Sequence, residues 1–388
     1  MGGSRCDSFA LGIALVLTGC GMIGRPLAHP LEHPSAATIA LAPDVGCAYD
    51  SFDCNPPVRD MIGQIARLRQ RGEALGFHPG VMADPPTRVR HWQSIQRMAG
   101  AYSNYLLLTR AKRSASDAVV EVVRLASRDT DGGRLRSNRS GGRGLDVTAP
   151  PATDCVVDNV HARSAHPHAG GAQLAGKVLA VPLEGNGLGS RVELFDLSDP
   201  ARAASIGVIA HEVPGGISSE AGTAALAKLA DGSFVLLIGR RDARTLDFYQ
   251  STTTNIRATR WRYLDSWHAR DLRTAIGDAH FGDYQNLQLI AGTDHRLYLV
   301  GTHQHGLVFG SQWVDLFVVE GSRSITITKL AKRRVQCRNG SMQCNLDAGG
   351  GVYIDPAGTL IVYGVDHASN GPSTTGLRTA GTIKLTEF

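Results

Sequence analysis

The stretch Asp283-Tyr284-Gln285-Asn286-Leu287-Gln288 opens a unit that decides the fold, because the chain contains five such units. An ionisable residue comes first, small or amide residues follow it, and an apolar strand (here Leu297 to Gly301) comes after a short turn. The other four units open at His91, His168, Glu220 and Asp347. Internal repeats of this length indicate solenoids, propellers or arrays.

In each unit, the opening pattern is followed by a turn and by two further apolar strands. In the unit that opens at Asp283, the turn Gly292-Thr293-Asp294 precedes the apolar strand, and Val314-Asp315-Leu316-Phe317 forms a third strand. Units lie roughly 60 residues apart, against about 40–50 residues in a typical propeller blade. The sequence therefore predicts an all-β fold, a β-propeller of about five four-stranded blades. A β-sandwich also has short strands at regular spacing, but the shared register of the five units favours the propeller.

The last unit lacks an outermost strand, because the chain ends at Phe388 on a third strand. A strand from before His91 is therefore expected to close the ring, and Thr38 to Leu41 is the candidate.

The first twenty residues have the features of an export signal. Arg5 supplies a positive charge, and Phe9 to Leu17 is an apolar run too short to span a bilayer. The following Leu17-Thr18-Gly19-Cys20 resembles the lipobox of bacterial lipoproteins, which implies that Cys20 is lipidated. An ordinary secretory signal, or a short core segment that happens to contain a cysteine, is the alternative. By the same resemblance, Gly21 after the cysteine implies an exported, membrane-anchored lipoprotein in the outer membrane or facing the periplasm.

Export is consistent with the cysteines, because an oxidising compartment permits disulfides. Two close pairs each enclose a short polar loop, and they predict the disulfides Cys47–Cys54 and Cys337–Cys344. Neither pair has the paired C-x-x-C spacing of a structural zinc site.

Composition divides the chain into a signal peptide at 1–20, a tether and helical cap at 21–85, and a propeller at 86–388. One helix is expected in the cap, because apolar residues recur there at helical spacing from Val58 to Leu68. A Gly- and Arg-rich insertion at about 127–165 is expected to lack an ordered core. The net charge of +5 is mild for 388 residues, and with no recognisable nucleic-acid motif it predicts no nucleic-acid partner.

The opening residues of the units are the candidate site. Innermost strands line the central channel of a propeller, so residues in one register lie at one level around the axis. Two imidazoles and three carboxylates there could hold a divalent metal and activate water. The alternatives are structural hydrogen bonds between strands, or a channel that is polar because it is wet. The candidate metal-binding or channel-lining residues are His91, His168, Glu220, Asp283 and Asp347, with Gln93, Gln285 and Asn286 behind them.

No nucleophile elbow of the form Gly-x-Ser-x-Gly and no His-Glu-x-x-His motif occurs. We therefore expect a lipid-anchored binding platform for an envelope protein or glycan. The alternative is a metal-dependent hydrolase with its site at one end of the channel.

The carboxy-terminal two thirds resembles a group of uncharacterised exported bacterial β-propeller lipoproteins. The resemblance rests on His168-Ala169-Gly170-Gly171 through Val178–Pro182, on Leu246-Asp247-Phe248-Tyr249, and on Cys337 through Asp347. It implies a propeller in the cell envelope and no particular reaction. A weaker likeness to propeller lactonases would imply an axial calcium ion, but histidines at two of the five opening positions differ from that pattern.

Overall fold

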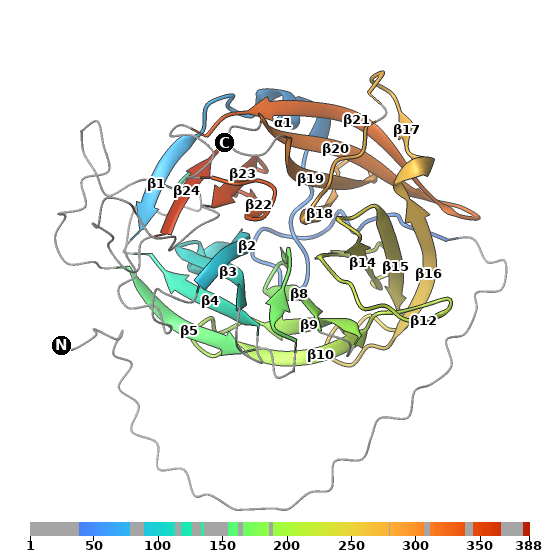
Figure 1. Ribbon diagram of the computed structural model, residues 1–388, viewed down its shortest axis with the longest axis horizontal. Helices are drawn as coiled ribbons and strands as arrows, with labels where there is room; N and C mark the ends of the chain where they lie inside the picture. Colours follow the sequence, from blue (N-terminus) through green and yellow to red (C-terminus); the bar gives the residue numbers. More distant parts are fainter. Residues whose placement is uncertain are drawn as a thin grey trace, which may run out of the picture.

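The structure, a computed structural model, describes residues 39–77, 89–112, 118–125, 133–135, 154–161, 166–185, 189–278, 280–305, 311–337, 344–365 and 383–388. Five antiparallel sheets surround a common axis, as Figure 1 shows. The predicted five-bladed β-propeller is therefore confirmed.

The blades follow one another along the chain, each beginning at the channel and ending at the rim. The first contains β2 (Val89–Arg97), β3 (Tyr105–Lys112), β4 (Val119–Arg124) and β5 (Cys155–His161). In the second, β6 (His168–Ala169) and β7 (Gln173–Ala175) share the innermost position, followed by β8 (Val178–Glu184), β9 (Ser190–Asp196) and β10 (Ala204–Ala210). The third contains β13 (Thr223–Lys228), β14 (Phe234–Arg240), β15 (Thr245–Ser251) and β16 (Trp261–His268).

The fourth blade contains β18 (Asn286–Ala291), β19 (Leu297–His305), β20 (Ser311–Gly321) and β21 (Ile325–Val335), with β17 (Arg273–Thr274) parallel to its outer edge. The fifth contains β22 (Gly350–Ile354), β23 (Leu360–Val365), β24 (Ile383–Glu387) and, outermost, β1 (Glu73–Phe77). A small hairpin of β11 (Glu212–Val213) and β12 (Gly216–Ile217) follows the second blade. Two short 3-10 helices, η1 (Gly100–Tyr102) and η2 (Ala269–Asp271), complete the elements together with the helix α1 described below.

The apolar core is divided into five clusters, one between each pair of neighbouring blades. The interface that closes the ring packs Ile361 and Tyr363 of the fifth blade against Trp92 and Ile95 of the first. A sandwich would have a single core between two sheets, so this division excludes the alternative fold.

Two details of the ring differ from expectation. The closing strand is β1, which pairs with β24, and not the stretch at Thr38 to Leu41. Ile39 instead donates its backbone N–H to Ser322, in the turn between β20 and β21. The chain reaches the outer edge of the fifth blade only after crossing a face of the ring, so the ring takes its last strand from within residues 21–85.

The second difference lies in the insertion at about 127–165. Part of it, Cys155–His161, forms β5 and pairs with β4. Val156 and Val160 pack on the cores at either side of the first blade, which explains why this part is ordered. The Gly- and Arg-rich stretches before it lie mostly outside the described residues.

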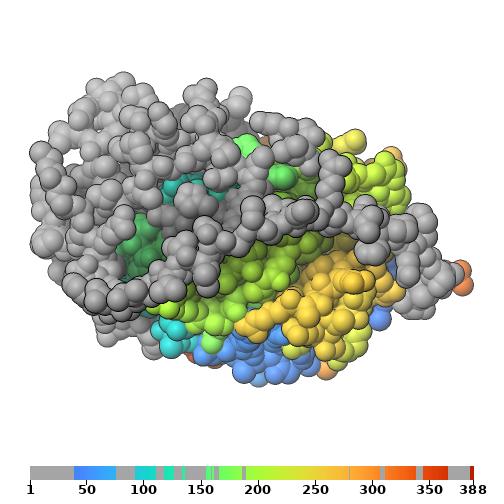
Figure 2. All heavy atoms as spheres, turned by 90° about the horizontal axis from the view of Figure 1, so that it is seen from below, coloured from blue at the N-terminus to red at the C-terminus, as the bar shows by residue number. Residues whose placement is uncertain are grey.

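Residues 39–60 cross the face of the ring on which the first and second strands of each blade are joined. Figure 1 shows this segment in blue across the centre, and Figure 2 shows blue atoms along one face. The backbone N–H of Asp44 bonds the carbonyl of Lys228 in the third blade, and that of Lys177 in the second bonds the carbonyl of Phe52. The predicted disulfide Cys47–Cys54 is formed within this segment, and Cys337–Cys344 is formed before the fifth blade.

The predicted helix is α1 (Met61–Arg67), which begins at Asp60, whose side chain accepts the N–H of Gly63. Met61 and Ile65 are buried with Val58 and Leu68 against the fourth and fifth blades. In the described part of the chain, no helix is long and apolar enough to cross a membrane.

Candidate functional site

The candidate site lies where the innermost strands begin, on the face opposite residues 39–60. His168 stands on β6, while Glu220, Asp283 and Asp347 each come three residues before an innermost strand. His91 lies on β2, but its side chain is outside the part of the structure that is described.

Electrostatic coupling shows that several of these carboxyl groups are close together. Burial raises the pKa of Asp347 to about 6, and the charges of Asp242 and Asp283 add to the rise, against the opposing effect of His303. The pKa of Asp242 is also raised by burial and then by Asp283, with smaller contributions from Glu220 and Glu184. We refer to Glu184, Glu220, Asp242, Asp283 and Asp347 as the carboxylate cluster.

Two members of the cluster, Glu184 and Asp242, were not predicted. Glu184 ends a second strand, β8, and Asp242 lies in the turn between β14 and β15. This turn places three consecutive non-glycine residues in the left-handed region, with φ of 56°, 54° and 61° at Arg241, Asp242 and Ala243. Such backbone is costly and often occurs at functional sites. The turn sequence Arg-Asp-Ala is unusual because it contains neither Gly nor Asn. This unusual turn was the only feature of the sequence that could have pointed to Asp242.

Hydrogen bonds hold this turn against neighbouring parts of the cluster. The carbonyl of Asp242 accepts the N–H of Tyr284 at 3.1 Å. Glu220 accepts the N–H of Arg241 at 3.1 Å, and Arg244 forms an ion pair with Asp283 at 2.5 Å. Both side chains of the ion pair are more than half exposed, so the pair orients Asp283 and contributes little stability.

His168 has hydrogen-bond partners at both ring nitrogens. Its Nδ1 lies 3.0 Å from Glu184 Oε2 and its Nε2 lies 3.1 Å from Gln93 Nε2. Burial would raise the pKa of Glu184, but the hydrogen bond and charge of His168 hold it below its usual value. Metal binding by His168 would require the loss of one of these contacts.

Glu220 is positioned by a buried Ser–His–Asp arrangement. His211 Nδ1 lies 2.8 Å from the Glu220 carbonyl and 2.9 Å from Ser190 Oγ, while its Nε2 lies 2.9 Å from Asp247. Ser190, His211 and Asp247 are almost entirely buried, so the serine is inaccessible to a substrate. This arrangement supports the 218–220 loop and is not a hydrolytic triad.

The innermost strands approach one another closely at glycines of the repeat. A Cβ at Gly171 would lie 1.8 Å from the carbonyl oxygen of Gln285, and one at Gly351 would lie 1.6 Å from that of Ile95. Only glycine permits these approaches. The small residues of the repeat therefore allow the backbones of the innermost strands to approach one another closely.

Three glutamines, Gln96, Gln173 and Gln288, join the innermost strands across the axis. Gln173 Nε2 donates to the Leu289 carbonyl at 2.8 Å, and its Oε1 accepts the N–H groups of Leu226 and Leu289. Both Gln96 and Gln288 donate to the carbonyl of Ala172. Side-chain hydrogen bonds between innermost strands are thus formed by amides five residues after His91, His168 and Asp283. Of the opening residues, His168 alone makes such a bond in the described part of the chain, to Gln93.

The three amides expected behind the opening residues have separate environments. Gln93 contacts His168. Asn286 donates to the Ala348 carbonyl at 2.9 Å, and its buried Oδ1 has no hydrogen-bond partner among the described residues. Gln285 is half-buried.

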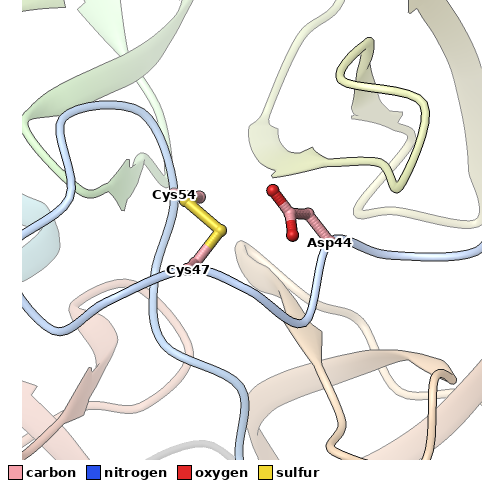
Figure 3. Close-up of side chains that lie close together, drawn as sticks. All are labelled: Asp44, Cys47 and Cys54. Atoms are coloured by element: carbon pink, nitrogen blue, oxygen red, sulfur yellow. A yellow bond between two sulfur atoms is a disulfide. The ribbon is translucent and has the colours of Figure 1, made fainter.

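Within the described residues, one set of three metal-ligand side chains has its donor atoms within 4.8 Å of one another, namely Asp44, Cys47 and Cys54. Figure 3 shows that the two sulfurs are bonded to each other. A disulfide offers no thiolate, so this set is not a metal site. His168, Glu220, Asp283 and Asp347 do not form such a set.

Comparisons with known proteins concern the fold. No protein-family model and no curated protein matches the chain. Similar solved structures include the Bombyx mori GH32 β-fructofuranosidase BmSUC1 (TM-score 0.46, 10% identity, 83% of this chain and 63% of that one). Another is a putative glycoside hydrolase from Parabacteroides distasonis (TM-score 0.42, 10% identity, 85% of this chain and 95% of that one). A bifunctional GH43-CE protein of Bacteroides eggerthii has a TM-score of 0.26 at 12% identity over 52% of this chain and 28% of that one. The chain thus spans less than two thirds of the length of BmSUC1. Similarity this remote gives no information about the activity of this protein.

Proposed function

We propose that the carboxylate end of the channel binds a glycan. The observation that carries this proposal is the carboxylate cluster, whose members come from five segments of the ring and are close enough to raise the pKa of Asp242 and Asp347. Arg244 is ion-paired with one member, Asp283. Ionised carboxylates only accept hydrogen bonds, so their complement is a ligand rich in donors. Sugar hydroxyls and amino groups meet this need, whereas a polyanion would be repelled.

A glycan fits the described surface better than a protein partner does. Protein interfaces centre on contiguous apolar and aromatic side chains. The exposed large hydrophobic residues in the described ranges come from four different segments, and they are Ile62, Val208, Ile217 and Ile276. Attachment to the envelope through Cys20 would present such a site to envelope polysaccharides, and Cys20 lies outside the described residues.

Hydrolysis of a glycosidic bond at the same place is a second candidate function. It is favoured by the contrast between Asp347, whose raised pKa of about 6 suits a general acid, and Asp283, which is ion-paired with Arg244. Glycosidases commonly use two carboxyl groups, one of which donates a proton while the other is ionised.

The test is calorimetric titration of the purified protein with a panel of neutral and amino-substituted oligosaccharides. Asp283→Asn and Asp347→Asn should each weaken binding of any ligand found by about tenfold or more, because a charge-assisted hydrogen bond contributes roughly 1.5–3 kcal/mol. Asp271→Asn is the control, since this exposed residue lies on η2. Unchanged affinity in both cluster variants would refute the proposal, and product analysis of the same mixtures separates binding from hydrolysis.

A further inference from the structure

Trp313 on β20 is a tryptophan that the apolar core does not use. Trp92 and Trp267 are buried in clusters between the blades, and Trp261 packs on another. Trp313 is half-buried but belongs to none of the five clusters. Within the described residues it also contacts no other aromatic ring and forms no hydrogen bond. Because tryptophan is enriched where proteins bind partners, this ring is a candidate contact surface.

The register of the fourth blade places Trp313 between the carboxylate cluster and an arginine. Trp313 is paired with His303 on β19 and with Arg334 on β21, so the three side chains lie in one row on one face of the sheet. Against the rise caused by burial, His303 lowers the pKa of Asp347, so the row begins beside the cluster. Figure 1 shows these strands following one another outwards from the channel. Because neighbouring strands lie about 4.8 Å apart, β20 is roughly 10 Å outward from the innermost strand.

Positive charge borders the ring of Trp313. The Nζ of Lys332 lies 5.3 Å from the centre of the ring and 2.9 Å from Asp278 Oδ2, so this lysine already has a carboxylate partner. Arg334 is exposed and forms no ion pair with any of the described residues. A guanidinium group binds a carboxylate through two parallel hydrogen bonds, and Arg334 is available for such a group on a ligand.

We propose that Trp313 and Arg334 form a second subsite of the glycan site and that this subsite takes an acidic sugar, a uronate. This inference rests on the proposed function. The apolar face of the sugar ring lies on Trp313, and its carboxylate pairs with Arg334. Because the carboxylate cluster repels an acidic group near the axis, the two oppositely charged regions also fix the direction of the ligand. Units that carry hydroxyl or amino donors lie at the axis, and the acidic unit lies outward over β20.

The experiment is calorimetric titration of the full-length protein with two matched trisaccharides. One has two hexosamine units with free amino groups and one terminal uronic acid unit, and in the other the carboxyl group is reduced to a hydroxymethyl group. The parent protein should bind the acidic form about tenfold more tightly or better, because a charge-assisted hydrogen bond contributes more than a neutral one. Arg334→Gln should remove this preference by lowering the affinity for the acidic form alone. The matched control is Arg202→Gln, since Arg202 is 77% exposed in the turn between β9 and β10.

Substitution of the tryptophan gives a separate readout. Trp313→Leu should weaken the binding of both trisaccharides by about two- to tenfold, because contact with the ring does not depend on the carboxylate. The control is Trp261→Leu, which changes another half-buried tryptophan at the start of β16 and should leave both affinities unchanged. Because Arg334 is exposed, its variant also avoids the risk that the Trp313 variant fails to fold.

The outcomes separate this inference from the proposed function. Equal affinity of the parent protein for the two trisaccharides overturns the acidic subsite, as does a preference that persists in Arg334→Gln or an affinity that Trp313→Leu leaves unchanged. The glycan site itself still stands in these cases if Asp283→Asn and Asp347→Asn weaken binding. Absence of binding of either trisaccharide also overturns the subsite, and if the oligosaccharide panel gives no binding either, the proposed function fails with it.

Discussion

At Asp347, burial and the charges of neighbouring carboxylates act together to raise the pKa of the side chain. Its pKa of about 6 means that the folded protein holds this proton more tightly than the unfolded chain does. Between about pH 4 and 6 the folded state therefore binds more protons, and stability falls as pH rises through that range. Above it, an ionised Asp347 remains close to Asp242 and Asp283, which is an unfavourable arrangement in the absence of a ligand.

Asp347→Asn should therefore stabilise the protein at pH 8 and have little effect at pH 4. The shift from 3.8 to about 6 corresponds to about 3 kcal/mol, and partial exposure of the side chain reduces the expected gain to roughly 1–2 kcal/mol. Urea unfolding at the two pH values measures it, with Asp271→Asn as the control. An equal effect at both pH values would contradict the assignment. A variant that is more stable yet binds no ligand would show the usual conflict between stability and function.

The repeat pattern in the sequence singles out some members of this cluster but not Glu184 or Asp242, for a physical reason. Asp283 and Asp347 open repeat units, so periodicity alone places them at one level. Glu184 and Asp242 are equally close to the site but reach it from the end of a second strand and from a turn, where no repeat constrains residue type.

At the scale of elements, the innermost strands are joined by amides as well as by apolar contacts. Gln173 alone satisfies backbone groups of Leu226 and Leu289, which belong to the third and fourth blades. The sequence could not predict these bonds, because the acceptors and donors lie about 50 to 120 residues away and are backbone groups without a residue signature. The amide side chains of the repeat were expected to lie behind the site. Gln96, Gln173 and Gln288 instead join innermost strands.

Gln173→Leu should destabilise the protein by about 3 kcal/mol or more, because it leaves buried backbone groups of two blades without partners, at roughly 1–3 kcal/mol for each. Chemical denaturation measures the change. Gln285→Ala is the control, since the side chain is only half-buried and makes no hydrogen bond within the described residues, and should lie within about 0.5 kcal/mol. Similar losses in both variants would show that Gln173 acts through packing and not through its hydrogen bonds.

At the scale of the whole molecule, the ring is closed by its two ends. β1 completes the fifth blade beside β24, and Leu75 is buried in the core between the fifth and first blades. The repeat pattern showed that a strand was missing, and the strand does come from before His91. Its position was not predicted because Glu-Ala-Leu-Gly-Phe lacks the apolar alternation of the other strands.

Leu75→Ala should loosen this closure and cost about 2–4 kcal/mol, as for other buried leucines. Amide hydrogen exchange can localise the effect, because regions that open separately exchange separately. Amides of β24 should exchange faster while those of β14, across the ring, change less. Ile62→Ala, at a position that is 50% exposed on α1, should leave both unchanged. Uniform acceleration throughout the ring would indicate that closure and the rest of the fold open together.

The proposed membrane location rests on Cys20, at the end of the apolar segment that follows Arg5. A cysteine carrying several acyl chains is held firmly in a membrane, whereas a single chain gives marginal binding. Cys20→Ala should therefore move the protein from the membrane to the soluble fraction or leave it unprocessed. Metabolic labelling with a fatty acid, followed by fractionation, measures both effects. Recovery of the parent protein in the soluble fraction without acyl label would exclude lipidation, and would leave the carboxylate cluster to act on soluble rather than membrane-proximal glycans.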